Sequence, residues 1–583
     1  MCGISGFNWK DENKIKGMVS CLSYRGGDAL GTFLDEGISL GHNRLSVIDL
    51  SSGANQPMLG GSGLAIVFNG EIYNFHELRK ELESKYQFKT KSDTEVILAG
   101  YRVWGKSVVE RLNGMFSFAI YDKQEQSLFC ARDHLGMKPL YYFWDGKKFI
   151  FASEIPAILT HDVPRILNKE ALNHYFRILF VPEPMTLFKD IYKLPASHTL
   201  LLKDGEIVIE PYGKKDSSRT NLSYEESVKA LKEKVVKAVE RHLIADVPVG
   251  VYLSGGIDSS IILAAASRFH KNIKTFTIGF DLEDNNDSSK FNADFRLAER
   301  TAKFFNTEHH PLTFSVEEAM EALGEVSRHN SDPISNPTSI AMFLLARFAR
   351  KEVTVALTGN AGDELFGGYE RYRTALWARY LYTRSNLFAK FMFEKDNKLS
   401  RIIATEFFLP SSKIKKYYKK YLHGGDAVEA LMNADRLAWL PEHFFMLSDK
   451  MSMASALEER MPLGDKELLA FSQTLPRKYK VDLSRTKKIL KDAFKDDLPE
   501  FLLDQPKRGW FSPAAKWFRN KEFANFARGV LRESYYAGSS QLFNWEALHE
   551  MLEKHISKEE YNLTPLWAVL TFQLWAKEFK IEI

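Results

Sequence analysis

The stretch Val-Pro-Val-Gly-Val-Tyr-Leu-Ser-Gly-Gly-Ile-Asp-Ser-Ser-Ile-Ile-Leu-Ala-Ala-Ala-Ser-Arg-Phe, residues 247–269, decides the fold of the C-terminal half. An apolar run, Val247 to Leu253, is followed by a loop of small residues, Ser254 to Ser260, and then by a second apolar run, Ile261 to Phe269. Glycines let a backbone approach phosphate oxygens, while serine hydroxyls and a helix N-terminus donate hydrogen bonds to them. The pattern therefore predicts a strand, a phosphate-binding loop and a helix.

The same loop contains Asp258, a carboxylate that can hold Mg²⁺ beside bound phosphates. No Gly-Lys-Thr/Ser follows the glycines, which excludes a Walker A site. Further apolar runs, Thr275 to Phe280 and Val353 to Leu357, alternate with segments of helical spacing. This alternation predicts an α/β unit in which helices cover a parallel sheet, followed by a mostly helical tail.

The first 210 or so residues show short alternating strands separated by turn signals. Leu64 to Phe68 precedes Asn69-Gly70, and Phe116 to Tyr121 precedes Asp122. This pattern predicts packed β-sheets with a few helices.

A domain boundary is expected where these two patterns meet. Residues 213–222 are polar and lack periodicity, whereas Tyr224 to Leu243 has apolar residues at helical spacing. We therefore divide the chain into a domain of residues 1–212 and a domain of residues 223–583.

Composition is that of an ordinary globular protein. The chain has 583 residues, which at about 100–200 residues per domain predicts two or three folded units. A net charge of +4 is too small to indicate attraction to nucleic acid or to a membrane surface. No apolar stretch reaches the ~20 residues of a spanning helix, and the N-terminus has no basic segment followed by an apolar one. We expect a cytoplasmic protein without membrane insertion.

The cysteines are few and show no CxxC pair, which fits a reducing compartment and gives no metal-site spacing. Cys21 and Cys130 are expected to be core residues. Cys2 differs because removal of Met1, usual before a small residue, would give it a free α-amine. Such an amine, with a pKa of about 7.7–8.0, can take the proton of a thiol of pKa ~8.5. Cys2 is therefore a candidate nucleophile for attack on an amide carbonyl.

Six segments of the N-terminal half support this interpretation. They are Cys2-Gly3-Ile4-Ser5-Gly6, Arg25-Gly26-Gly27-Asp28, Asn43-Arg44-Leu45-Ser46, Asn69-Gly70-Glu71-Ile72-Tyr73-Asn74, Ser92-Asp93 and Arg132-Asp133-His134-Leu135-Gly136. In order and spacing they resemble the glutaminase domain of class II amidotransferases. That resemblance implies an α+β sandwich of the Ntn-hydrolase type.

The resemblance also implies roles for particular residues. Arg44 would pair with the α-carboxylate of glutamine, and Glu71 and Asp93 with its α-ammonium. The Asn69 side chain and the Gly70 N–H would form the oxyanion hole, although Asn69-Gly70 could instead be a plain hairpin turn. The remaining glutamine-binding candidates are Leu45, Ser46, Val47 and Ile48. One departure is Gly27, where asparagine synthetases usually have proline, and we expect it to loosen a loop that closes over glutamine.

The loop Ser254 to Ser260 resembles the pyrophosphate loop of ATP pyrophosphatases, which adenylate an acceptor. Further segments resemble the synthetase domain of asparagine synthetase: 357–369 (Leu-Thr-Gly-Asn-Ala-Gly-Asp-Glu-Leu-Phe-Gly-Gly-Tyr), 449–454 (Asp-Lys-Met-Ser-Met-Ala), 457–462 (Leu-Glu-Glu-Arg-Met-Pro) and 506–509 (Pro-Lys-Arg-Gly). This implies an α/β domain of the adenine-nucleotide-α-hydrolase type that uses ATP and Mg²⁺.

By this resemblance, Asp258 and Asp363 would bind Mg²⁺ and Lys487 would meet the phosphates, with Lys488 and Lys491 as rivals. The expected ATP-binding residues are Leu253, Ser254, Gly255, Gly256, Asp258, Ser259, Ser260, Ile278, Thr358, Gly359 and Lys487. Glutamine, ATP and a carboxylate acceptor are then the substrates, and an apolar ammonia tunnel, with Met115 as a candidate wall residue, would join the sites. A homodimer is left open.

Asn360 makes the identity of the acceptor carboxylate uncertain from sequence, because asparagine synthetases commonly carry glutamate at this position. An amide cannot serve as a carboxylate base. We favour conversion of aspartate to asparagine, and keep three alternatives: amidation of another carboxylate such as a uronic acid sugar, a glutaminase with an inactive synthetase half, and a cyclase that needs no ammonia. Residues Cys2, Arg44, Asn69 and Asp93 argue against the cyclase.

Two further segments are interpreted structurally. The acidic run Asp281 to Asp287 departs from a calcium-binding loop and is expected to be a mobile loop. The pair His309-His310 lacks zinc-site spacing and is expected to have a structural role.

Overall fold

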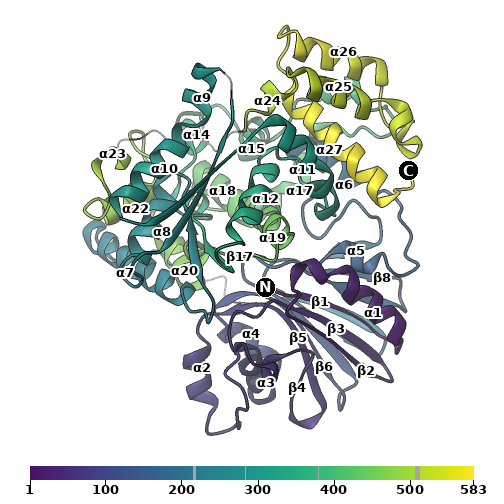
Figure 1. The fold of residues 1–583 in the computed structure, drawn as a ribbon, viewed down its shortest axis with the longest axis vertical. Coiled ribbons are helices and arrows are strands. Elements are labelled where there is room, and N and C mark those ends of the chain that lie inside the picture. The colour runs from purple at the N-terminus through teal and green to yellow at the C-terminus, as the bar shows by residue number, and fades with distance from the viewer. Residues whose placement is uncertain (214–217, 283, 379, 504, 506–511) are drawn as a thin grey trace.

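The computed structural model describes residues 1–213, 218–282, 284–378, 380–503, 505 and 512–583. A β-sandwich built from the N-terminal part of the chain occupies one end of the molecule, and an α/β unit with added helices occupies the rest (Figure 1). Among the described residues, none of the helices combines the length and the apolar character needed to cross a bilayer. The predicted segment 506–509 lies outside the described residues, as does part of the predicted linker, 214–217.

The sandwich consists of two six-stranded antiparallel sheets, as the sequence predicted. The first sheet has the order β10 (Ile191–Lys193), β8 (Tyr141–Trp144), β9 (Phe149–Ala152), β1 (Gly3–Phe7), β3 (Ile38–Arg44), β2 (Ala29–Asp35). The second has the order β12 (Glu206–Pro211), β11 (His198–Lys203), β7 (Ser127–Arg132), β6 (Gly114–Asp122), β5 (Leu64–Ile72), β4 (Met58–Leu59).

Alternating side chains explain the layering of the sandwich. On β5, Ile66 and Phe68 pack in one apolar cluster with helix α3 (Asp93–Trp104), whereas Ala65 and Val67 pack in another cluster with the first sheet. A strand that is buried on both faces reads as a continuous apolar run. Cys130 belongs to the cluster between the sheets, which confirms it as a core residue.

The second half is built on a five-stranded parallel sheet, also as predicted. Its order is β15 (Glu308–Phe314), β14 (Lys274–Phe280), β13 (Val249–Tyr252), β16 (Val355–Leu357), β17 (Glu458–Arg460). All four neighbouring pairs are parallel. The edge strand β17 was not predicted from the sequence. Its three residues are all charged, and such a run does not resemble a buried strand.

The helices fall into three groups. Those of residues 1–213 are α1 (Glu12–Cys21), α2 (Phe75–Leu82), α3, α4 (Val108–Arg111), α5 (Ile155–Ile158) and α6 (Lys169–Ile178). Those of the α/β unit are α7 (Tyr224–His242), α8 (Ile257–Ala266), α9 (Asn285–Phe291), α10 (Ala293–Phe304), α11 (Val316–His329), α12 (Thr338–Ala349) and α13 (Gly362–Phe366). The remainder are α14 (Glu370–Ala378), α15 (Arg384–Met392), α16 (Asp396–Ile402), α17 (Ser411–Tyr418), α18 (Ala427–Ala434), α19 (Met446–Met453), α20 (Lys466–Thr474), α21 (Arg477–Lys480), α22 (Lys488–Phe494), α23 (Glu500–Leu503), α24 (Ala514–Trp517), α25 (Lys521–Val530), α26 (Trp545–Ile556) and α27 (Leu563–Phe579).

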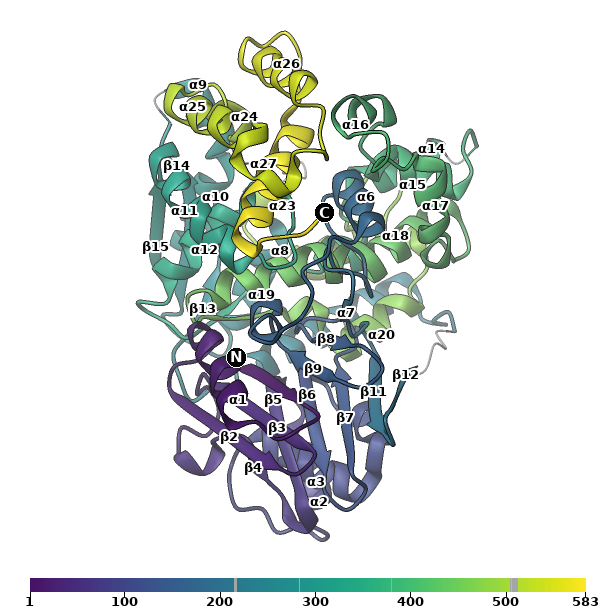
Figure 2. The same ribbon diagram turned by 90° about the vertical axis from the view of Figure 1, so that its right-hand side faces the viewer.

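The C-terminal helices lie at the end of the molecule opposite the sandwich, and α6 reaches up to them (Figure 2). The Tyr175 hydroxyl on α6 donates to the Ala568 carbonyl of α27 at 3.0 Å. A π-helical segment, Asp435–Phe445, joins α18 to α19 and carries Pro441 in its interior. Helix α19 follows directly and packs against β17, which brings its polar side chains to the sheet edge.

Two local segments differ from what their turn-forming residues suggest. The alternative that Asn69-Gly70 is a hairpin turn is wrong, because β5 continues through it and pairs with β6 as far as Ile72 and Gly114. The acidic run Asp281 to Asp287 is not all loop, since α9 begins at Asn285 and the Asp284 side chain caps it; Glu283 lies outside the described residues. At Asn69-Gly70, pairing with β6 outweighs the local turn preference, whereas at α9 the Asp284 cap itself starts the helix.

Buried ion pairs join the two halves of the chain. Arg25, which is completely buried, contacts Glu154 at 2.7 Å and Asp449 of α19 at 2.8 Å. Arg25 lies two residues before Gly27, and its side chain extends from this loop into the interface between the two halves. Lys193 likewise contacts Glu442 at 2.6 Å. Because a buried charge is stable only when paired, these contacts fix how the halves sit against each other.

We expect Arg25→Met to destabilise the folded chain by about 3–5 kcal/mol, because two buried carboxylates lose a partner. The matched control is Arg373→Met, which removes an exposed pair with Glu370 and is expected to cost less than about 1 kcal/mol. Urea unfolding of both variants and the wild type measures the difference. Equal losses in the two variants would contradict the proposed role of Arg25.

Candidate active sites

The first site surrounds Cys2, which immediately precedes the central strand β1 and is buried. Its main-chain N–H donates to Asn69 Oδ1 at 3.0 Å, from the neighbouring sheet. The Asn69 Nδ2 group is buried and has no hydrogen-bond partner among the described residues. An unsatisfied donor beside a thiol is what an oxyanion hole requires, since it can bind charge that develops during the reaction.

Gly70 supplies the second expected donor, and its position permits only glycine. Its φ is +156°, and a Cβ there would lie 2.1 Å from the Met115 carbonyl oxygen of β6. Met115 itself is fully buried in the large core that both halves share. Strand β5 therefore brings Asn69 and Gly70 to Cys2 as one rigid unit.

A small cavity beside Cys2 contains most of the expected glutamine-binding residues. Its lining includes Met1, Cys2, Arg44, Leu45, Val47, Ile48, Gly70, Glu71 and Asp93. Met1 is 1% exposed and its terminal ammonium contacts Glu458 at 2.7 Å, so this residue fills the space next to the thiol. Removal of Met1 would both free the Cys2 amine and open the cavity. Ser46 and Asn69 are not among the lining residues; the Ser46 N–H donates to Asp28 at 2.7 Å, and Asn69 Oδ1 accepts from the Cys2 N–H.

Arg44 and Asp93 lie on the cavity wall with opposite charges. The Arg44 guanidinium donates to the Ser51 carbonyl at 2.8 Å and to Asn55 Oδ1 at 2.7 Å, which holds it in place at the end of β3. Asp93 accepts from the Ile72 N–H at 3.0 Å, and burial raises the pKa of Asp93 to about 6. The Asp93 carboxylate is thus mostly ionised at pH 7 and can pair with an ammonium group.

Glu71 is held from the other half of the chain. Arg460 of β17 contacts Glu71 Oε2 at 2.9 Å, while Glu71 Oε1 has no hydrogen-bond partner among the described residues. The same guanidinium contacts Glu458 at 2.7 Å. Burial disfavours the charged form of Glu458, but the N-terminal ammonium and Arg460 outweigh this effect and lower the pKa of Glu458 to about 2. The site of the first domain is therefore completed by a strand of the second.

We expect Asn69→Ala to lower the rate of glutamine hydrolysis by about 10²–10³-fold, because one donor to the developing oxyanion is lost. Glutamate release from glutamine measures this effect. The control is Asn74→Ala, since Asn74 donates to the Arg111 carbonyl at the surface. Asn69→Ala with wild-type turnover would contradict the oxyanion assignment.

The second site lies at the carboxyl ends of the parallel strands, where open α/β sheets bind their ligands. Gly255 has φ +72°, and a Cβ there would meet the Asp294 carbonyl oxygen at 2.1 Å. The hydroxyls of Ser254 and Ser259 contact each other at 3.0 Å, which closes the loop. Helix α8 begins at Ile257, earlier than predicted, and no side chain among the described residues caps its N-terminus. Its first N–H groups can therefore bind phosphate.

The other expected nucleotide-binding residues lie on or directly after neighbouring strands. Leu253 follows β13, Ile278 lies on β14, and Thr358 follows β16 with its N–H bonded to the Arg460 carbonyl at 2.9 Å. Gly359 packs against the start of α8, since a Cβ there would lie 2.6 Å from the Ser259 nitrogen. The structure thus brings these residues together around the loop.

Lys487 lies between the two expected magnesium ligands. It is 2% exposed, contacts Asp363 Oδ1 at 2.6 Å and also bonds to Asp258. Its main chain has φ +51° at the start of α22, which directs this lysine inward. The rivals face elsewhere: Lys488 contacts Asp482 at 3.1 Å, and Lys491 contacts the Leu503 carbonyl at 3.4 Å. The two aspartates, which already hold one cation between them, fit a divalent cation.

Asn360 lies between Gly359 and α13, half-buried, and its side chain reaches α19. Asn360 Nδ2 donates to Ser448 Oγ at 3.4 Å. On the same helix Asp449 accepts from Arg25, whose Nε also donates to the Cys2 carbonyl at 3.1 Å. The adjacent residues Ser448 and Asp449 of α19 thus contact groups of the second and of the first site, respectively.

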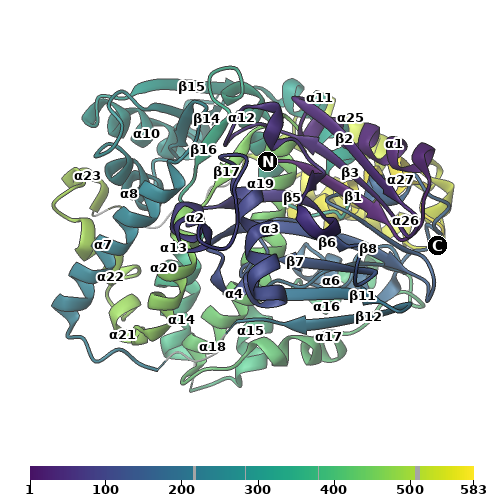
Figure 3. The ribbon, with the colours of Figure 1, turned by 90° about the horizontal axis from the view of Figure 1, so that it is seen from below.

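Sequence reasoning missed this junction. Figure 3 shows the N-terminus beside β17 and α19, where the two halves meet. The segments 449–454 and 457–462 were recognised only by resemblance and were given no role. Residues 458–460 gave no local signal of a strand, because all three are charged.

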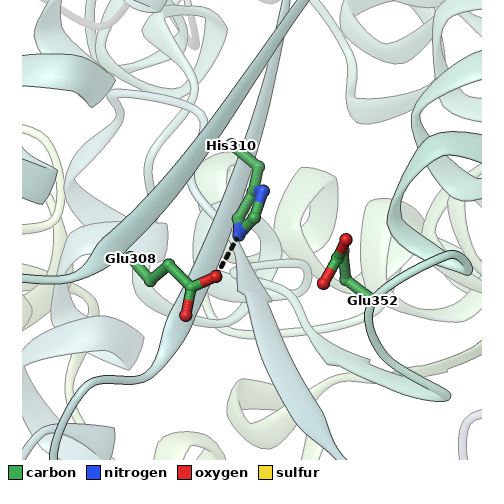
Figure 4. A group of neighbouring side chains, drawn as sticks. All are labelled: Glu308, His310 and Glu352. Atoms are coloured by element: carbon green, nitrogen blue, oxygen red, sulfur yellow. Dashed lines mark hydrogen bonds and ion pairs between the residues drawn. The ribbon is translucent and has the colours of Figure 1, made fainter.

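His310 lies between Glu308 and Glu352 at the outer edge of the parallel sheet (Figure 4). His310 Nε2 contacts Glu308 at 3.1 Å, and the Lys274 ammonium contacts Glu352 at 2.6 Å and Glu308 at 3.6 Å. His309 bonds to Thr275 at 2.9 Å. The lysine already neutralises these carboxylates, so we assign the group a structural role.

Comparison with known proteins gives matches over nearly the whole chain. The family model for asparagine synthase matches residues 230–577, and that for the glutamine amidotransferase domain matches residues 1–213. Asparagine synthetase (glutamine-hydrolyzing) 1 of Bacillus subtilis (strain 168) is 32% identical over 99% of this chain and 96% of its own length. A putative asparagine synthetase of Mycobacterium tuberculosis (strain ATCC 25618 / H37Rv) is 31% identical over 95% of this chain and 92% of its own. The amidase chry2 of Gibberella zeae is 25% identical over 96% of both chains.

Proposed function

Because the chain belongs to the asparagine synthase family and carries a glutamine amidotransferase domain, we propose that it converts aspartate to asparagine with glutamine as the nitrogen donor. Family membership makes it an ATP-dependent ligase. One observation carries the proposal: both candidate sites adjoin strand β17. The first contains the Cys2 thiol and the Asn69 donor, and the second contains the loop of residues 254–260 with Asp258 and Asp363.

Glutamine would be hydrolysed in the cavity beside Cys2. After removal of Met1, the Cys2 amine takes the thiol proton and sulfur attacks the side-chain amide carbon of glutamine. Asn69 Nδ2 and the Gly70 N–H stabilise the oxyanion, while Arg44 and Asp93 orient the two ends of the amino acid. Ammonia leaves, and water releases glutamate from the thioester.

The acceptor carboxylate would be activated at the second site. A carboxylate oxygen attacks the α-phosphate of ATP, and pyrophosphate leaves, which gives an acyl adenylate. The N-terminus of α8 and Lys487 hold the phosphates and balance their charge. Asp258 and Asp363 would hold Mg²⁺, which neutralises further phosphate charge when bound.

Ammonia would pass from Cys2 to the acyl adenylate through the interior. Free ammonia in water at pH 7 is mostly protonated and is then no nucleophile, so an enclosed route is an advantage. We propose that Met115 and β17 border this route, because both lie beside the first site and Arg460 accompanies Thr358 at the second.

A second candidate is amidation of a different carboxylate, such as that of a uronic acid sugar. Asn360 favours it, since an amide at this position offers an acceptor no negative charge. The similarity to an amidase as well as to asparagine synthetases is compatible with either acceptor.

The acceptor is tested by pyrophosphate release from purified protein with MgATP and glutamine. Aspartate, uronic acid sugars and small peptide acids are supplied in separate reactions, and the amide product is identified by mass spectrometry. Pyrophosphate and asparagine formed with aspartate support the proposal. Release with another acid only would move the assignment to that acid, and glutaminase activity with no release for any acid would mean an inactive synthetase half.

A further inference from the structure

A buried carboxylate lies one hydrogen bond beyond Asn360. The Ser448 hydroxyl, which accepts from Asn360 Nδ2, itself donates to Glu459 Oε2 of β17. Glu459 is 1% exposed. The three side chains form a line from the second site to the edge strand of the sheet, and its inner end is a carboxylate.

Strand geometry explains why Glu459 points this way. Successive side chains of a strand face opposite sides, and Glu458 and Arg460 both face the first site, where they contact the Met1 ammonium and Glu71. Glu459 is directed to the other side, toward α19. In the parallel pair with β16 it lies opposite Ala356, four residues before Asn360. One short strand thus presents charged groups to both sites.

We propose that Glu459, acting through the Ser448 hydroxyl, accepts the proton that ammonia loses when it attacks the acyl adenylate. This inference rests on the proposed function. The need for such a group is chemical: the attacking nitrogen carries a positive charge until a proton leaves, and the amide of Asn360 cannot take it. Because Glu459 acts through another residue, we describe it as a positioning residue for Ser448.

The ammonia lone pair forms a C–N bond to the acyl carbon, and the C–O bond to AMP breaks with its electron pair on the phosphate oxygen. The Ser448 oxygen takes a proton from nitrogen while its own proton passes to Glu459. The products are the amide, AMP and one proton, which Glu459 afterwards releases to water.

The surroundings of Glu459 suit a proton acceptor. Burial raises the pKa of Glu459 to about 7, against the hydrogen bond from Ser448 and the charge of Lys138. Asp449 on α19 adds to the rise, and Tyr252 on β13 faces the same carboxylate. A group with this pKa can both take and release a proton near neutral pH.

The experiment compares wild type, Glu459→Gln and the double variant Asn360→Glu with Glu459→Gln. Ammonium replaces glutamine, and two quantities are measured with the acceptor found above: amide formation, and acceptor-dependent exchange of labelled pyrophosphate into ATP. We expect Glu459→Gln to lower amide formation by about 10²-fold or more while exchange stays within twofold of wild type. The double variant, which returns a carboxylate to the same line of hydrogen bonds, is expected to recover at least tenfold.

Glu95→Gln is the matched control, because Glu95 is equally buried in the sandwich and accepts from main-chain N–H groups of residues 89 and 90. It should leave ammonium-driven synthesis unchanged. Amide formation by Glu459→Gln at the wild-type rate would contradict this inference but not the proposed function. The same holds if Glu459→Gln loses exchange and amide formation equally and the double variant recovers neither. A wild type that amidates no acceptor would overturn the proposed function, and the inference with it.

Discussion

Cys2→Ala is expected to abolish glutamine-driven synthesis, by at least about 10⁴-fold, while ammonium-driven synthesis stays close to wild type. The proposed attacking atom is the thiol sulfur of Cys2, and no other described thiol lies in the cavity lining. Residue 2 lies outside the phosphate loop, so its substitution should not affect ATP binding. Alanine at this position can still donate its main-chain N–H to Asn69 Oδ1. Because the two sites are separate, the variant should lose synthesis from glutamine and keep synthesis from ammonium.

The measurement is asparagine or other amide formed with glutamine and, separately, with ammonium. Cys21→Ala is the control, since Cys21 is a half-buried residue at the end of α1 and should be silent in both assays. Glutamine-driven turnover by Cys2→Ala at more than a hundredth of wild type would refute the assignment of the nucleophile. Equal loss with both nitrogen sources would instead indicate damage to the junction around β17.

Lys487→Met is expected to lower pyrophosphate release by about 10²–10³-fold, the size of effect seen when one preorganised group that stabilises developing charge is lost. The ammonium lies between Asp258 and Asp363. Its loss removes a cation from the place where the phosphates arrive and leaves two carboxylates facing each other. Methionine has nearly the length of lysine, so the change is mainly one of charge.

Glutaminase activity, which depends on the other site, reports whether Lys487→Met is folded and should remain. Lys488→Met and Lys491→Met are matched controls on the same helix, and their side chains contact Asp482 and the Leu503 carbonyl instead. We expect both to release pyrophosphate within a fewfold of wild type. A larger loss in either control than in Lys487→Met would reassign the phosphate-binding lysine.

Much of the candidate sites could be predicted from local sequence. The strand, glycine-rich loop and helix of 247–269 are set by apolar runs and by the backbone freedom that glycine alone has at Gly255. Cys2 was found from its position in the chain, and the family segments placed Asn69, Asp93 and Asp258. Each of these signals is contained within a few neighbouring residues.

Contacts between distant residues could not be predicted. Lys487 and Asp258 are 229 positions apart, and Arg460 and Glu71 are 389 apart, so no spacing relates them. The strand character of 458–460 comes from pairing with β16, because hydrogen bonds to a neighbour and burial hold charged residues in a conformation that they do not prefer by themselves.

The sequence alone determined which chemical groups this protein carries and the two kinds of fold that hold them, since strand and helix periodicity and glycine freedom are local properties. Only the tertiary structure decided which of the lysines lies between Asp258 and Asp363, that Arg25 lies in the interface, and that β17 adjoins both sites. Those outcomes depend on the burial of charge. A buried carboxylate or guanidinium is stable only beside a partner, and the partner is fixed by how the whole chain packs.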